Sequence, residues 1–160
     1  MRQFSQLLDG LVYTRSRNGK LDLIASYMRQ APDPDRGWAL AALTGNLDIK
    51  AVKASTIAEM TRTRVDPVLF EMSRDYVGDL AETVALLWPK SEDQPQEIDD
   101  GSLTLSSIID RLHAVSRASA PATLAQMMDH LDASGRFALL KLATGGLRVG
   151  ISARLAKTGF

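Results

Sequence analysis

Apolar residues recur three and four positions apart along most of the chain, which is the spacing of a helix that buries one face. The first such run, from Phe4 to Val12, predicts an amphipathic helix over residues 3–14. Alternating runs of β-branched residues do not occur, so the pattern predicts an all-α fold without strands. The later runs with helical spacing are residues 21–28, 38–43, 52–60, 68–76, 80–88, 103–112, 124–131 and 137–142.

Polar signals between these runs predict several helix boundaries. Asp66 can cap a helix whose first position is Pro67, and Asp79 with Glu82 three residues later has the spacing of a capping box. Within the runs, some residues are expected on the buried side. These core candidates include Val68, Leu69, Met72, Tyr76, Leu86, Trp88, Met60, Met127 and Met128.

The chain of 160 residues is expected to form a compact multi-helix domain with two helical lobes, residues 1–64 and 103–160. Connecting helices over 65–88 and an acidic loop over 89–102, with five carboxylates, would join them. The two lobes resemble each other near Phe4 and Leu105, which suggests an internal pseudo-repeat. Chance similarity between amphipathic helices is the alternative.

Near the C-terminal end, three glycines fall within six residues, at Gly145, Gly146 and Gly150, with Arg148 between them. A helix that ends on Gly145 or Gly146 uses the positive φ that glycine allows. A second helix that starts near Gly150 would present unpaired N–H groups to a phosphate. The alternative is a corner between two helices, with its arginines in solvent.

Basic residues gather in two places. The polar turn over residues 14–20 contains three basic residues and no acidic one, and no acidic residue follows Asp132. The basic residues after Asp132, expected to lack local partners, are Arg136, Lys141, Arg148, Arg154 and Lys157. In the suspected repeat Asp48 occupies the place of Arg148, so the second glycine turn is the one expected to meet phosphate.

The bulk composition excludes several functions. The formal net charge is zero, which argues against a strongly basic nucleic-acid binder but not against one basic face. The absence of cysteine excludes a disulfide and a zinc–thiolate site. No apolar run approaches the ~18 residues of a membrane span.

Catalytic patterns are also missing. The two histidines, His113 and His130, lie on separate helical runs, and neither a Gly-x-x-x-x-Gly-Lys-Ser/Thr loop nor a Gly-x-Ser-x-Gly elbow occurs. No metal site is expected. We therefore expect a binding or scaffold domain rather than an enzyme.

The chain resembles the N-terminal DNA-binding domain of ATP-dependent DNA ligases, most closely those of bacteria. The segments that carry this resemblance are residues 11–20, 32–40, 75–89 and 144–150, and the Gly146-Leu147-Arg148-x-Gly150 turn is the most family-specific of them. The resemblance implies an all-α domain on the minor-groove face of nicked double-stranded DNA. Such a domain grips phosphates and sugars on both sides of the nick without reading sequence.

In these ligases a nucleotidyltransferase domain and an OB-fold domain follow, and a lysine in a Lys-x-Asp-Gly motif takes AMP from ATP with Mg²⁺. That motif is absent here, so the chain looks like an isolated domain that needs no cofactor and does not seal nicks alone. The resemblance implies a monomer of the bacterial cytoplasm at the nucleoid, with no membrane partner, and a role in DNA repair, recombination or replication. Its partners would be nicked DNA and the ligase's own catalytic and OB domains.

The predicted DNA-binding residues come from the resemblance and from charge. Gly145, Gly146, Leu147, Arg148 and Gly150 lie on the turn that faces DNA in the family. The residues added on physical grounds are Ser152, Arg154 and Lys157 on the following helix, Arg15, Arg17, Asn18 and Lys20 in the polar turn, and Lys53.

Two other functions stay open. A helical module that recruits a repair protein would show an exposed apolar patch instead of a basic face. A sequence-reading helix–turn–helix regulator ranks third, because the helix after Gly150 offers no Asn or Gln to read bases.

Overall fold

The computed structural model describes residues 1–47, 49, 52–89, 103–145 and 147. Within these residues the chain forms nine α-helices and no strand, which confirms the predicted all-α fold. The helices are α1 (Arg2–Tyr13), α2 (Arg17–Gln30), α3 (Asp35–Leu43), α4 (Ala54–Arg62), α5 (Pro67–Val77), α6 (Leu80–Leu87), α7 (Leu105–Ala114), α8 (Ala120–Asp129) and α9 (Ala133–Thr144). None of these helices is long and apolar enough to span a membrane.

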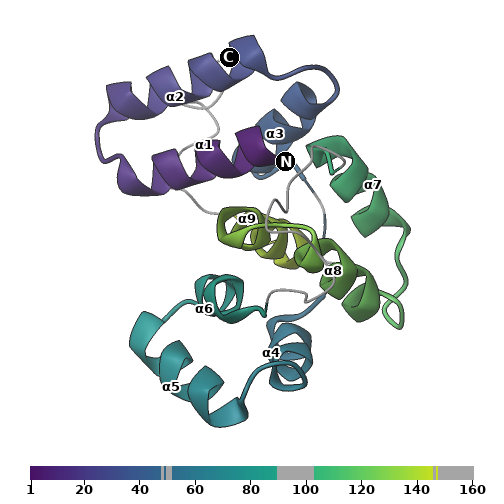
Figure 1. Cartoon of the computed structure of the whole chain (residues 1–160). Helices are drawn as coiled ribbons and strands as arrows, with labels where there is room; N and C mark the ends of the chain where they lie inside the picture. The colour runs from purple at the N-terminus through teal and green to yellow at the C-terminus, as the bar shows by residue number, and fades with distance from the viewer. Residues whose placement is uncertain (48, 50–51, 90–102, 146, 148–160) are drawn as a thin grey trace.

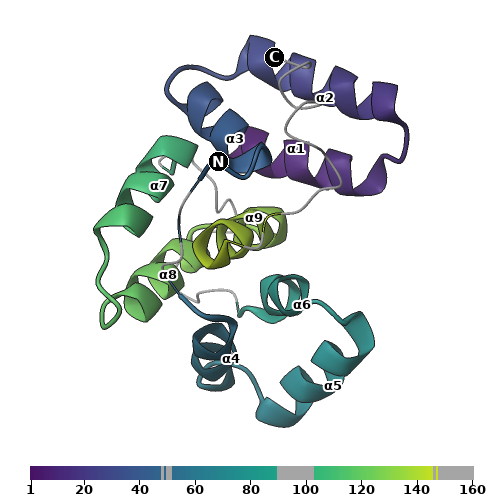
Figure 2. The same cartoon turned by 180° about the vertical axis from the view of Figure 1, so that it is seen from behind.

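Helix α9 is the centre of the fold. It packs against α1, α6 and α8, and Figures 1 and 2 show α1 and α2 towards one end of the molecule and α4, α5 and α6 towards the other. Ala138, Leu139, Leu140 and Leu142 of α9 are all buried, so this helix is covered on most of its circumference. Both ends of the molecule therefore depend on one central helix.

The predicted helix ends are confirmed where local chemistry sets them. The carboxylate of Asp66 accepts hydrogen bonds from the N–H groups of Val68 and Leu69 at 2.8 and 3.2 Å, with Pro67 in the first helical position. Asp79 likewise accepts from the N–H of Glu82 at 2.9 Å. Only this half of the expected capping box forms at α6. In the described residues the complete box is at α7, where Thr104 and Ser107 bond reciprocally.

The prediction of which α5 residues are buried is wrong. Phe70 is the one buried residue of this helix, whereas Val68, Leu69, Met72 (67% exposed) and Tyr76 (93% exposed) face solvent. Helix α5 packs mainly against α6 and α4, so most of its surface stays in contact with solvent. Leu86 was also expected in the core and is exposed, whereas Trp88 is buried as predicted.

Arg136 was expected to lack a local partner, and this prediction is also wrong. Its side chain is only 5% exposed and lies under the C-terminal ends of α6 and α8. Nε donates to the carbonyl of Met128 at 3.0 Å, and a terminal nitrogen donates to the carbonyl of Trp88 at 3.4 Å. Burial lowers the pKa of Arg136, and the nearby charges of Asp129 and Asp132 oppose that effect.

The same corner continues through Trp88. Its indole N–H donates to Asp129 at 2.9 Å, and Arg64 bonds the same carboxylate while its guanidinium lies 4.8 Å from the centre of the Trp88 ring. Arg136, Trp88, Asp129 and Arg64 thus tie together the ends of α4, α6, α8 and the start of α9. The Arg136 side chain is a structural part of the molecule.

The two-lobe division and the pseudo-repeat stay hypotheses. Helix α4 belongs to the first lobe by sequence and makes contacts with α5, α6 and α8. Residues 90–102 of the acidic loop lie outside the described part of the chain.

Candidate functional site

The polar turn between α1 and α2 is built from local hydrogen bonds. Thr14 ends α1 by donating its N–H to the carbonyl of Gly10 at 3.0 Å. The hydroxyl of Ser16 caps α2 by accepting the N–H of Gly19 at 3.1 Å. The chain therefore reverses direction in three residues, with the backbone held on both sides.

Two glycines allow the turn to be this tight. A Cβ on Gly10 would lie 3.1 Å from a methyl carbon of Leu23, so α1 and α2 approach closely there. A Cβ on Gly19 would lie 2.7 Å from the methyl carbon of Thr14. The first turn of α2 therefore rests against the end of α1, which gives the basic residues of the turn a firm support.

Three of the predicted DNA-binding residues are exposed on this turn: Arg15, Arg17 and Asn18. Lys20, the fourth predicted residue, is partly buried and is not without a partner. Among the described carboxylates none forms an ion pair with Arg15 or Arg17. The structure thus brings this group together at one end of the molecule, as α2 in Figures 1 and 2 shows.

The start of α2 carries positive side chains, whereas the N-terminus of an isolated helix is stabilised by negative ones. A helix N-terminus carries partial positive charge and is stabilised by acidic side chains, yet the first turn of α2 contains none. The N–H groups of Arg17 and Asn18 stand at the first two helical positions, where a helix supplies no partner. Guanidinium groups and free N–H groups together make a position suited to an anion.

The second predicted group begins where α9 ends. Gly145 has φ of 71°, in the left-handed region, and donates its N–H to the carbonyl of Leu142 at 3.3 Å. The predicted helix end at Gly145 is confirmed. Leu147 is partly buried against the core. The other predicted residues of this group, namely Gly146, Arg148, Gly150, Ser152, Arg154 and Lys157, lie outside the described part of the chain.

Lys53 stands close to this end of α9. Its neighbour Val52 is buried and donates its N–H to the carbonyl of Ala143 at 3.4 Å. Lys53 itself is exposed, at the position that precedes α4. No sequence pattern places Lys53 beside the glycine turn, because about ninety residues separate them. They come together in the fold, where Val52 bonds to Ala143 at the end of α9.

Lys141 was also expected to be an uncompensated cation, and this is wrong. Its ammonium donates to Asp79 at 2.8 Å and lies 5.5 Å from the centre of the Phe137 ring. Burial by itself would raise the pKa of Asp79. The hydrogen bond from Lys141, the N–H groups of Glu82 and Ala81 and the lysine charge outweigh it and hold that pKa below its usual value.

Replacing Asp79 with asparagine is expected to lower the free energy of unfolding by about 0.5 kcal/mol at neutral pH, since this pair is partly solvent-exposed. Asparagine keeps the helix cap, so the change isolates the charge. Because the pKa of Asp79 is lowered in the folded state, its contribution is present above the pKa of the unfolded chain and disappears as pH falls through the folded pKa. Urea unfolding of both proteins across acidic pH should show the difference shrinking towards zero. A difference that stayed constant with pH would contradict the assignment.

The sequence of the whole chain was compared with known proteins and protein families. None of the curated proteins matches it. The protein-family model described as DNA ligase N terminus matches residues 1–159.

Proposed function

Because the chain belongs to the family of N-terminal domains of ATP-dependent DNA ligases, we propose that it binds nicked double-stranded DNA through phosphates, without reading base sequence. The observation that carries this proposal is the pair of exposed arginines, Arg15 and Arg17, at the start of α2. They lack carboxylate partners among the described residues and stand beside unpaired N–H groups.

A phosphate relieves the unfavourable electrostatics at this turn. Two guanidinium groups next to the positive end of a helix repel one another and the helix dipole. Phosphate oxygens accept from both kinds of donor, and every base pair presents the same phosphates. The neutral net charge of the chain does not oppose this, because the field at one turn depends on local charges.

The end of α9 supplies a second contact in this proposal. Lys53, Gly145 and Leu147 are the described members, and Gly146, Arg148 and Gly150 with Ser152, Arg154 and Lys157 complete it. Asn18 and Lys20 belong to the first contact. Two contacts on different helices hold the duplex at two points, which suits a domain that lies across a nick. A nicked strand bends at lower cost than an intact one, so nicked DNA is the better fit.

In the proposal, this chain does not hold the cofactors of nick sealing. The chain has no Lys-x-Asp-Gly motif, and no group of three described His, Asp or Glu side chains could hold a metal ion. We therefore assign no chemical step to this chain. In the proposal ATP and Mg²⁺ act on the catalytic domain of the whole ligase, and the catalytic and OB domains are partners of this one.

The wider setting is part of the same proposal. As part of a DNA ligase, the domain serves nick sealing in repair, recombination or replication. The proposal places it as a monomer in the bacterial cytoplasm at the nucleoid.

The proposal is tested by titrating the chain against labelled nicked and intact duplexes of equal sequence at several salt concentrations. Binding should weaken steeply as salt rises, with a slope of about −0.9 for each phosphate neutralised. The nicked duplex should bind more tightly, and scrambling the base sequence should leave the affinity unchanged. Salt-independent binding, or a strong preference for one sequence, would contradict the proposal.

Replacing Arg148 with alanine should weaken DNA binding by about eightfold near 0.1 M salt and flatten the salt slope by about one unit, because one phosphate contact is lost. The same anisotropy titration measures both quantities. Arg111→Ala is the matched control, since Arg111 is an exposed arginine on α7, a helix that carries none of the predicted DNA-binding residues. If Arg148→Ala and Arg111→Ala bind alike at every salt concentration, Arg148 does not contact DNA.

A further inference from the structure

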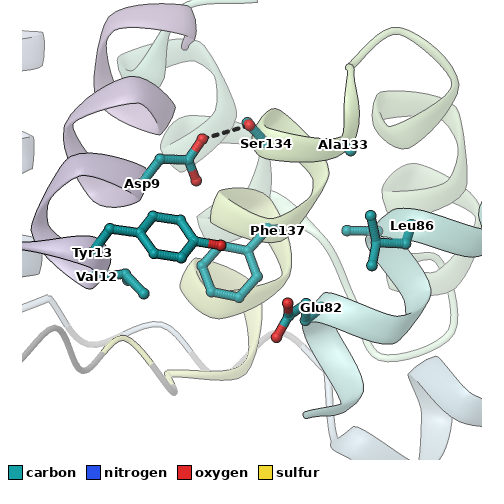
Figure 3. Close-up of a pocket in the computed structure, with 9 residues that line it drawn as sticks. Asp9, Val12, Tyr13, Glu82, Leu86, Ala133, Ser134 and Phe137 are labelled. Carbon is teal, nitrogen blue, oxygen red and sulfur yellow. Dashed lines mark hydrogen bonds between the residues drawn. The ribbon is translucent and has the colours of Figure 1, made fainter. Parts of the chain in front are cut away.

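A groove with apolar walls lies where α1 and α6 both pack against α9. Val12 and Tyr13 form one wall and Leu86 the other, with Phe137 of α9 between them, as Figure 3 shows. The groove has a volume of about 180 Å³. This is many times the ~15 Å³ that one water molecule needs, so the space accepts a large side chain.

The groove is open because small residues stand where α6 and α9 come together. Ala85 and Ala133 leave the space between the two walls unfilled. The apolar side chains along it are strongly exposed, with Tyr13 at 81% and Leu86 at 62%. Apolar surface in contact with water is unfavourable by about 25 cal/mol per Å², so covering these side chains would release free energy.

The charged residues that line the groove are acidic. Asp9 of α1 and Glu82 of α6 stand on opposite sides of it. One oxygen of Asp9 accepts from the hydroxyl of Ser134, which leaves the other oxygen available. The ammonium of Lys141, which lies 5.5 Å from the centre of the Phe137 ring, is already paired with Asp79. This edge therefore repels a polyanion such as DNA and attracts a cation.

We propose that this groove binds a segment of a partner protein that carries an aromatic or large aliphatic side chain flanked by lysine or arginine. The apolar side chain would fill the space beside Phe137 and cover Tyr13 and Leu86. The flanking cations would pair with Glu82 and with the open oxygen of Asp9. The groove is acidic and the proposed DNA contacts are basic, although Tyr13 lies only two residues before Arg15. The inference rests on the groove alone and does not depend on the proposed function.

The test uses the whole chain and a displayed library of random peptides, with the Ala133→Phe variant used to remove peptides that bind elsewhere. Ala133 is exposed at the first position of α9, so phenylalanine there should fill the groove and leave the core intact. The selected peptides should share an aromatic or large aliphatic residue next to lysine or arginine. A synthetic copy of the strongest peptide then serves as the probe in fluorescence anisotropy.

Three variants decide the outcome. Ala133→Phe should abolish binding of the synthetic peptide. Glu82→Lys should weaken it by about tenfold, because an attraction at the rim becomes a repulsion. The exposed pair Arg111→Ala and Arg117→Ala, on α7 and in the turn after it, is the matched control and should change nothing. Circular dichroism checks that each variant folds. If Ala133→Phe or Glu82→Lys does not fold, Leu86→Asp takes its place and should likewise weaken binding of the peptide.

Several results would overturn the proposal. These are the recovery of no peptide, a selected sequence without basic residues, or binding that survives in Ala133→Phe. Competition between the peptide and duplex DNA would assign the groove to the DNA-binding face instead. A concentration-dependent dimer that Ala133→Phe disrupts would assign it to a second copy of the chain. DNA binding by Ala133→Phe is expected to equal that of the parent, so failure here is distinguishable from failure of the DNA-binding proposal.

Discussion

Replacing both Arg15 and Arg17 with alanine is expected to weaken binding to nicked double-stranded DNA by about 60-fold near 0.1 M salt. Each lost phosphate contact lowers affinity by about eightfold at that concentration, and two contacts are removed together. The backbone of the turn should survive, because Ser16, Thr14 and Gly19 hold it without either guanidinium group. The loss should be equal for all base sequences.

The measurement is a salt titration of the double variant against the parent, on the nicked duplex. The salt slope should flatten by about two units, and the two affinities should converge at high salt. The double variant Arg111→Ala with Arg117→Ala removes the same net charge from exposed positions elsewhere and serves as the control. If both double variants lose affinity equally, net charge rather than the turn governs binding, and the proposed contact is wrong.

Replacing Arg136 with methionine is expected to lower the free energy of unfolding by about 3 kcal/mol. Methionine fills much of the same space but donates no hydrogen bond, so the carbonyl of Trp88 loses the guanidinium donor and the carbonyl of Met128 keeps only backbone donors such as the N–H of Leu131. A buried group left without its partner costs about 1–3 kcal/mol, and Asp129 loses a nearby positive charge. The corner where α4, α6, α8 and α9 meet should loosen first.

Urea unfolding followed by circular dichroism checks this value. Lys141→Met is the matched control on the same helix, because it removes a cation whose ion pair is partly exposed and should cost less than about 1 kcal/mol. DNA binding by Arg136→Met, measured where the variant is fully folded, should stay near that of the parent. Equal stabilities of the two variants would show that the buried hydrogen bonds of Arg136 contribute nothing.

The helix ends were predictable because their causes are local. Asp66 and Asp79 cap α5 and α6 by bonding N–H groups two or three residues ahead, and Gly145 ends α9 by taking a positive φ. Each of these signals acts within one turn of helix, so neighbouring residues suffice to reveal it. The buried stripe of α1 was predictable for the same reason, since helical spacing aligns Phe4, Leu8 and Leu11.

The partners of long side chains were not predictable. Arg136 and Lys141 stand in a stretch without acidic residues, which suggested free cations. The folded chain brings Asp79 to Lys141 and the carbonyls of Trp88 and Met128 to Arg136, in two cases from more than forty residues away. The prediction that the apolar face of α5 is buried was wrong for a similar reason. Helical spacing identifies the apolar face but does not show whether another helix covers it.

By itself, the sequence determined that this is an all-α domain of the DNA ligase N-terminal family, with several helix ends and the exposed arginines of the turn before α2 in definite places. These properties depend on residues close together in the chain. Tertiary structure alone decided which cations are buried or paired, that Lys53 lies beside the end of α9, and that α1, α6 and α9 enclose an acidic-edged apolar groove. Those outcomes depend on which helices meet, and contacts between distant segments leave no regular spacing in a single sequence.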